Sequence, residues 1–177
     1  MALPFRYRWL ESKGGPKIIL VALSLYGTEE IPGGRSNPKI ISWAKELGIP
    51  DYTADSIPWC GLFVAYVVFK AGWADHIPAN PLWARDWAKF GQEASKASLG
   101  DVLVFSRNGG GHVGFYVGED DDCYHVLGGN QSDAVTITRI RKERCIAVRR
   151  PKWRVAQPPE VTPIFLEPTG KISTNEV

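Results

Sequence analysis

The sequence contains a cysteine and a histidine that could together do covalent chemistry. Cys60 lies in the stretch Ile57-Pro58-Trp59-Cys60-Gly61-Leu62, at the start of an apolar run that ends at Gly72. At a helix N-terminus, backbone N–H groups and the helix dipole favour a thiolate, and a nearby imidazole can accept the thiol proton. The sequence therefore predicts a cysteine nucleophile suited to acyl transfer, such as amide hydrolysis.

Three histidines could serve as the base. His112 begins a predicted strand with glycines on both sides, which leave room for another group to approach closely. His76 lies in a loop, where a surface or capping role is usual, and His125 lies within an alternating strand. We predict that His112 is the base of Cys60.

The third member of the site is expected at the end of the strand that finishes with Gly128-Gly129-Asn130. Successive residues of a strand point alternately to opposite faces. Because His125 and Asn130 are separated by an odd number of positions, their side chains should point to opposite faces and should not meet. The Asn130 amide oxygen could instead accept a hydrogen bond from His112. An isolated cysteine in an apolar helix is usually a core residue, so the prediction of a Cys60, His112 and Asn130 triad depends on the three features together.

The surrounding elements are expected to be helices first and strands second. The capping signals predict helices over 16–25, 38–47, 58–71 and 81–90. Short β-rich runs separated by turn residues follow at 102–105, 112–117, 123–127, 134–140 and 145–149. This order predicts an α+β fold with an antiparallel meander of roughly five strands. The acidic turn at 119–122 lacks the ligand spacing of an EF-hand, so we expect a solvated hairpin tip.

Length and composition favour one domain. The 177 residues, 44% hydrophobic and 23% charged, are enough for one core. We place the domain at 1–155 and a Pro-rich tail at 156–177, packed in part by Ile164, Phe165 and Leu166. The odd count of three cysteines and the lack of Cys-x-x-Cys argue against a disulfide scaffold or a structural metal. We expect no metal and no cofactor, with Cys123 and Cys145 as small buried hydrophobes.

Charge and hydropathy limit the classes of binding partner that we expect. A net charge of +2 does not require nucleic acid, and the basic residues between Arg139 and Arg154 are interpreted as a solvated hairpin face in preference to a site for anionic polymers. The N-terminus lacks a signal-peptide core, and the run from Ile18 to Leu25 is too short to span a bilayer. We expect a monomer that is made in the cytoplasm without stable membrane insertion.

The motifs taken in order resemble those of a known family. They are Asp55-Ser-Ile-Pro-Trp-Cys-Gly-Leu-Phe-Val64, Gly100-Asp-Val-Leu-Val-Phe105, Gly111-His-Val-Gly114 and Gly128-Gly-Asn-Gln-Ser132. Over roughly Gly14 to Arg150 the chain resembles the CHAP and NlpC-type papain-like peptidoglycan hydrolases, most of all compact phage and prophage members. The resemblance implies that Cys60 is the nucleophile, His112 the base and Asn130 the orienting residue. Many CHAP enzymes have an acidic third residue where this chain has Asn130.

By this resemblance the chain is expected to cleave an amide in bacterial stem peptides, as an N-acetylmuramoyl-L-alanine amidase or an endopeptidase. It would act on the cell wall as an endolysin or a virion-associated lysin. We expect substrate contacts from Trp59, Tyr52, Gly111 and Gln131, with Tyr52 also a candidate second donor to the oxyanion. The alternatives are an interbacterial amidase effector, an intracellular cysteine protease, and a catalytically silent cell-wall-binding or virion structural module.

Overall fold

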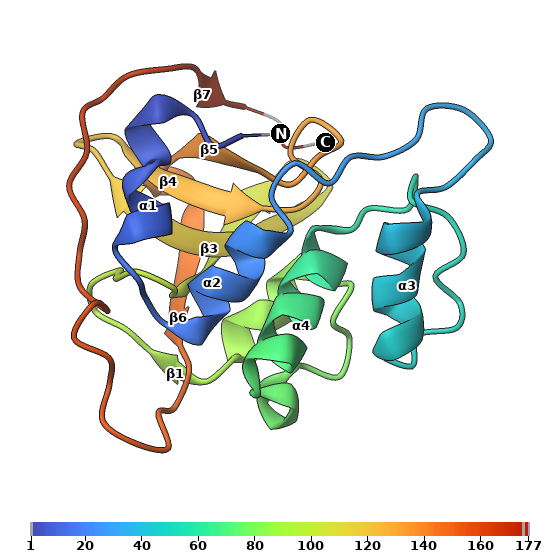
Figure 1. The fold of residues 1–177 in the computed structure, drawn as a ribbon, viewed down its shortest axis with the longest axis horizontal. Coiled ribbons are helices and arrows are strands. Elements are labelled where there is room, and N and C mark those ends of the chain that lie inside the picture. The colour runs from blue at the N-terminus through green and yellow to red at the C-terminus, as the bar shows by residue number, and fades with distance from the viewer. Residues whose placement is uncertain (1, 175, 177) are drawn as a thin grey trace.

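The computed structural model describes residues 2–174 and 176, and most of its helices lie on one side of a curled sheet (Figure 1). The α-helices are α1 (Trp9–Ser12), α2 (Lys17–Ser24), α3 (Pro38–Glu46) and α4 (Cys60–Ala71), with short 3-10 helices at Phe5–Tyr7, Ala74–His76, Ala84–Lys89 and Lys142–Arg144. The strands are β1 (Gln92–Glu93), β2 (Val102–Arg107), β3 (Gly110–Glu119), β4 (Cys123–Gly128), β5 (Thr136–Arg141), β6 (Cys145–Arg150) and β7 (Ile172–Ser173). The α+β fold class is confirmed.

The predicted helix boundaries follow from local capping. The Asn37 side chain accepts a hydrogen bond of 2.9 Å from the Lys39 N–H at the start of α3. Gly72, with a φ of 96°, ends α4 in the left-handed conformation that favours glycine. The fourth expected helix is a shorter 3-10 helix that begins at Ala84, and the sequence did not predict α1 near the N-terminus.

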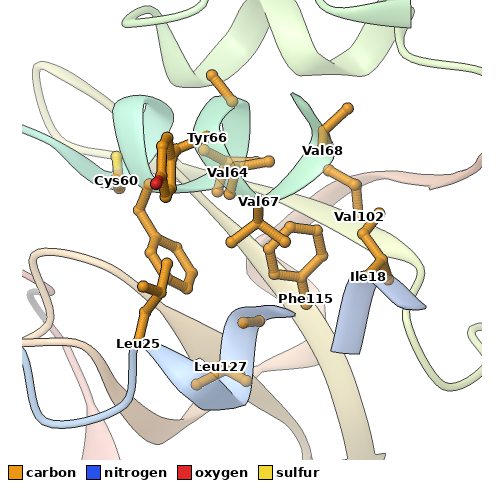
Figure 2. Packing of buried hydrophobic residues seen from close by; sticks show 14 of the residues in the cluster. Ile18, Leu25, Cys60, Val64, Tyr66, Val67, Val68, Val102, Phe115 and Leu127 are labelled. Carbon is orange, nitrogen blue, oxygen red and sulfur yellow. The ribbon is translucent and has the colours of Figure 1, made fainter. Parts of the chain in front are cut away.

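Helix α4 lies at the centre of the core. All of its residues except Phe69 and Lys70 are buried. Figure 2 shows its side chains together with Phe115 of β3, Leu127 of β4 and Ile18 of α2, with Cys60 at one end of the helix. A helix that is apolar around most of its circumference needs such cover on several sides. The core therefore fixes where Cys60 is held.

The sheet has the order β1-β6-β2-β3-β4-β5-β7, and β2 to β6 are antiparallel as expected. The predicted meander is wrong at its last step, because β6 pairs with β2 and not with β5. In a flat sheet these two strands would be about 19 Å apart, at about 4.8 Å per strand. The short link at 142–144 reaches at most about 14 Å. The sheet must therefore curl until β5 and β6 approach each other at this end.

Curling gives the sheet two apolar faces. One face packs against the helices, and the other encloses a smaller cluster made of Ala97, Leu103, Phe105, Tyr116, Val126 and Ile140. In β2, Val102 and Val104 belong to the helical side, while Leu103 and Phe105 belong to the smaller cluster. This is why most positions of β2 and β3 are buried instead of alternating between buried and exposed.

The acidic turn after β3 is not fully solvated, contrary to prediction. Asp120 is buried and accepts hydrogen bonds of 2.7 Å from Arg139 Nε and 2.8 Å from His125. The Tyr7 hydroxyl meets the other ring nitrogen of His125 at 2.8 Å. Burial alone would raise the pKa of Asp120, but the hydrogen bonds from Arg139 and His125 hold that pKa well below its ordinary value. This network ties the N-terminal turn to β4 and β5.

The basic segment from 139 to 154 also differs from expectation. Most of its arginines form hydrogen bonds or ion pairs within the protein and do not form a solvated face. The pairs are Arg139 with Asp120, Arg144 with Glu176, Arg149 with the Phe90 carbonyl, Arg150 with Asp101 and Arg154 with Asp75. Arg141 and Lys152 remain exposed. These charges stabilise the sheet edge and the connections around it.

The segment after Arg154 runs along the sheet. The Glu119 N–H donates to the Ile164 carbonyl at 2.8 Å, and the Leu166 N–H donates to the Glu119 carbonyl at 2.8 Å. Ile164 and Leu166 pack against the core as predicted, but Phe165 is 78% exposed because successive residues of an extended segment point to opposite sides. Within the described residues, no helix has the length and hydropathy that crossing a bilayer requires.

Candidate active site

Cys60 and His112 lie at neighbouring ends of α4 and β3. Cys60 is the first residue of α4, and His112 is the third residue of β3. The backbone N–H of Val113, which follows His112, lies close enough to hydrogen-bond the Cys60 sulfur. Cys60 is 7% exposed and His112 is 1% exposed. The fold thus brings the predicted nucleophile and base to one buried site.

Burial controls the protonation of Cys60. Desolvation raises the pKa of the thiol, while the N–H groups of Val113 and Gly61 and the charge of Arg107 lower it by less. The N–H groups at the start of α4 favour the thiolate as expected, but the net direction of the pKa shift is upward because burial outweighs them. The free-energy cost of removing a thiolate from water exceeds the stabilisation that these backbone N–H groups provide.

His112 is held neutral for the same reason. Burial lowers the pKa of His112 to about 4, against the opposite influence of the Glu176 carboxylate and a hydrogen bond with Gln131. At neutral pH the site therefore holds a thiol and a neutral imidazole. A neutral imidazole can accept the thiol proton as the sulfur attacks, which is general-base catalysis.

Gln131 bonds the ring of His112. Its Oε1 lies 3.0 Å from His112 Nε2, and its Nε2 donates to the Val126 and Thr136 carbonyls at 3.2 and 2.7 Å. Because the amide nitrogen is used on two carbonyl oxygens, Oε1 must be the acceptor, and His112 Nε2 carries the proton. Nδ1 then has the lone pair that can take a proton from the thiol.

Asn130 does not make the hydrogen bond that was expected of it. Among the described residues, its buried Oδ1 has no hydrogen-bond partner. Strand alternation ends with β4 at Gly128, and Asn130 has a left-handed φ of 55°. Beyond the strand, alternation no longer says which side chain faces His112, so the next residue, Gln131, takes that place.

The other two histidines lie elsewhere. His125 belongs to the buried network with Asp120 and Tyr7, and its side chain has no solvent exposure. His76 packs against the rings of Trp73 and Phe90, with centroid distances of 5.3 and 5.9 Å. Neither contact involves Cys60.

A groove of about 690 Å³ leads to Cys60. It is lined on one side by 48–51 and 57–58, on another by 79–85, and at the β2–β3 turn by Arg107 and Gly109 to Gly111. Gly61 allows the wall to close, because a Cβ at this position would overlap the Pro81 carbonyl oxygen. Cys60 is thus reached from a cleft of a size suited to a peptide.

Of the four predicted substrate contacts, Gly111 lines this groove. Trp59 is fully buried, and its indole N–H donates to Glu30 at 2.6 Å. Tyr52 is 3% exposed, and its hydroxyl donates to the Ile57 carbonyl at 2.9 Å. The polar atoms of Trp59, Tyr52 and Gln131 bond other groups of the protein. These three residues therefore stabilise the structure around the site and do not line the groove.

Glu176 is a site residue that sequence reasoning missed. Its carboxylate is buried, accepts hydrogen bonds of 2.8 and 2.7 Å from Arg144, and lies near enough to raise the pKa of His112. Arg144 also donates to the Ser106 carbonyl on β2 at 3.2 Å. The sequence around Glu176 has no periodicity or motif, so no local signal could have placed it here.

The comparisons with known proteins give one match. Residues 52–130 match the family model described as the CHAP domain. No curated protein and no solved structure matches the chain significantly. The matched segment contains Cys60, His112, α4 and the strands β2 to β4. Residues 52–130 are therefore similar to the CHAP domain, which is papain-like, and the match is consistent with a CHAP-type peptidoglycan hydrolase.

Proposed function

We propose that this chain hydrolyses an amide bond in the stem peptides of bacterial peptidoglycan, with Cys60 as nucleophile and His112 as general base. The observation that carries the proposal is the position of Cys60 on the wall of a peptide-sized groove, next to the start of β3, with His112 oriented by Gln131. The CHAP-domain match supports peptidoglycan as the substrate class and bacterial cell wall as the place of action.

The reaction is an acyl transfer in two halves. The Cys60 sulfur attacks the amide carbonyl while the thiol proton passes to His112 Nδ1. The imidazolium then gives that proton to the leaving amine, and the C–N bond breaks to leave a thioester. A water molecule next loses a proton to His112 and attacks the thioester, and the departing sulfur is protonated again.

The oxyanion of each tetrahedral intermediate needs hydrogen-bond donors. The N–H groups of Cys60 and Gly61 lie at the start of α4 and hydrogen-bond the sulfur, so they are our candidates. The first N–H groups of a helix have no partner within the helix, which suits them to this role. Tyr52 is less suited, since its hydroxyl donates to Ile57.

We further propose that the chain acts as a monomer, as a phage endolysin or virion-associated lysin. The bond cut is either the N-acetylmuramoyl-L-alanine amide or a bond within the stem peptide. An interbacterial amidase effector would use the same groove and the same chemistry. These settings differ in how the protein reaches the wall, and the products of digestion separate the amidase from the endopeptidase.

The test is digestion of purified peptidoglycan, with mass spectrometry of the fragments and labelling of new amino termini. Wild type should release fragments, whereas Cys60→Ala and His112→Ala should release none while keeping the far-UV circular dichroism of wild type. His125→Ala should keep turnover per folded molecule. Fragments from Cys60→Ala would overturn the proposal, and binding to the wall without fragments from wild type would favour a silent binding module.

A further inference from the structure

Arg85 is fixed on the groove wall beside the catalytic strand. Its Nε donates to the Gly110 carbonyl at 3.0 Å, and its stem crosses Gly111, where an added Cβ would come within 3.0 Å of Arg85 Cγ. In the described part of the chain this is the one hydrogen bond of the guanidinium, and the residue is exposed. Its two terminal amino groups are therefore the donors that a ligand in the groove can meet.

Arg107 brings a second guanidinium to the same place. It ends β2 directly opposite Gly110, and its Nη2 would lie 3.8 Å from a Cβ on that glycine. Its charge acts on both Cys60 and His112, lowering the pKa of each. Asp51 is the one carboxylate among the described residues that line this groove. Arg85 and Arg107 therefore both line the end of the groove at the β2–β3 turn, near Cys60.

An exposed guanidinium on the wall of a peptide groove matches a carboxylate. Arginine binds carboxylates through parallel N–H···O bonds in a fixed fork, and such charge-assisted bonds are about twice as strong as neutral ones. We propose that Arg85 forms a carboxylate-binding subsite that selects peptides with a free acidic group near the amide to be cut. This inference rests on the proposed function and adds the substrate group that the groove recognises.

Stem peptides offer a direct test because the α-carboxyl of their glutamyl residue can be free or amidated. We would measure binding of two synthetic acylated stem peptides, one of each kind, to the full chain carrying Cys60→Ala. This background is expected to bind the free-carboxylate peptide at least about tenfold more tightly. Adding Arg85→Gln should remove that preference and leave the affinity for the amidated peptide unchanged. Arg85→Lys, which keeps the charge without the fork, should retain part of it.

Lys89→Gln is the matched control. It removes one positive charge from the same 3-10 helix, but Lys89 pairs with Asp86 and lies outside the groove lining. It should keep the full preference. Equal affinity of the background for the two peptides would overturn the subsite, and so would an equal loss on both peptides in Arg85→Gln with an unchanged melting temperature.

Turnover of the same two peptides by wild type tests the proposed function separately. Cleavage without a carboxylate preference would refute the subsite and support the hydrolase. A carboxylate preference in binding without cleavage would support the subsite and refute the hydrolase on these substrates.

Discussion

Burial sets the starting protonation of Cys60 and His112, and one carboxylate moderates it. Desolvation lowers the pKa of His112 to about 4, and the charge of Glu176 raises that pKa against the trend. Glu176 is paired with Arg144, whose own charge lowers the pKa of His112. Neutralising Glu176 therefore removes the charge that raises the pKa of His112 and leaves the lowering effect of Arg144 unopposed.

We predict that Glu176→Gln shifts the acid limb of the pH profile of kcat/KM to lower pH. The base must be neutral to accept a proton, and a lower pKa keeps it neutral in more acidic solution. The measurement is the pH–rate profile on peptidoglycan fragments. Glu46→Gln, which breaks the remote pair with Lys70, should leave that limb in place. An unchanged or higher limb in Glu176→Gln would contradict the prediction.

We predict that Gln131, and not Asn130, orients the ring of His112. Gln131→Ala removes the acceptor for His112 Nε2, so kcat should fall by about 10- to 100-fold, the usual cost of losing a group that orients a site residue. Asn130→Ala should cost less, because its side-chain oxygen bonds no described residue. Steady-state kinetics on both variants decides between them, and a larger loss in Asn130→Ala would restore Asn130 as the orienting residue.

At the scale of elements, the site depends on how closely the loop at 79–85 approaches the start of α4. Gly61 faces the backbone of that loop, and a Cβ there would also lie 2.9 Å from the Leu82 backbone. Backbone cannot move aside as the end of a flexible side chain can. The position therefore needs glycine for space, although a helix interior ordinarily favours alanine.

We predict that Gly61→Ala displaces the groove wall and lowers stability by about 1–3 kcal/mol, the usual cost of overpacking. Turnover should fall with it, since Gly61 directly follows Cys60 at the start of α4 and faces the loop that forms the wall. Urea unfolding and kinetics measure the two effects. Gly72→Ala, at the other end of α4, is the matched control: its φ of 96° strains a side chain, but an added Cβ meets nothing there. It should lose stability without a change in KM.

At the scale of the whole molecule, buried polar groups connect the ends of the chain to the sheet. The network of Tyr7, His125, Asp120 and Arg139 lies at the end of β3 opposite to His112, and Arg139 also donates to the Gly170 carbonyl at 2.7 Å. Such networks stabilise a fold only while every member keeps its partner and its protonation state. They therefore make the whole molecule sensitive to acid.

We predict that the free energy of unfolding falls as the pH drops from about 6.5 to 4. His112 is neutral when folded down to about pH 4, whereas the unfolded chain protonates its histidines near pH 6.5. Between these values the unfolded state binds more protons, so acid favours it, by up to about 3 kcal/mol for this one histidine. The pKa of His125 is lowered in the same direction.

Denaturant unfolding at pH 7, 5.5 and 4 measures this loss. His112→Gln should make the dependence over that range shallower, since the substituted side chain does not titrate and His125 still does. A stability that stays constant or rises towards pH 4 in wild type would contradict the prediction. Below pH 4 the loss should continue, because the pKa of Asp120 is held below its ordinary value and its ion pairs fail only when it is protonated.

Local patterns were enough to predict most elements and where Cys60 and His112 lie within them. The capped start of α3, the glycine end of α4 and the five main strands follow from interactions between residues close in sequence, and so does the placement of Cys60 and His112 at element starts. The tertiary structure alone decided that β6 pairs with β2, that Gln131 bonds His112, that Glu176 lies beside it, and that Cys60 rests as a thiol. Each of these depends on packing between residues far apart in the chain or on the exclusion of water, and neither leaves a periodic signal in the sequence.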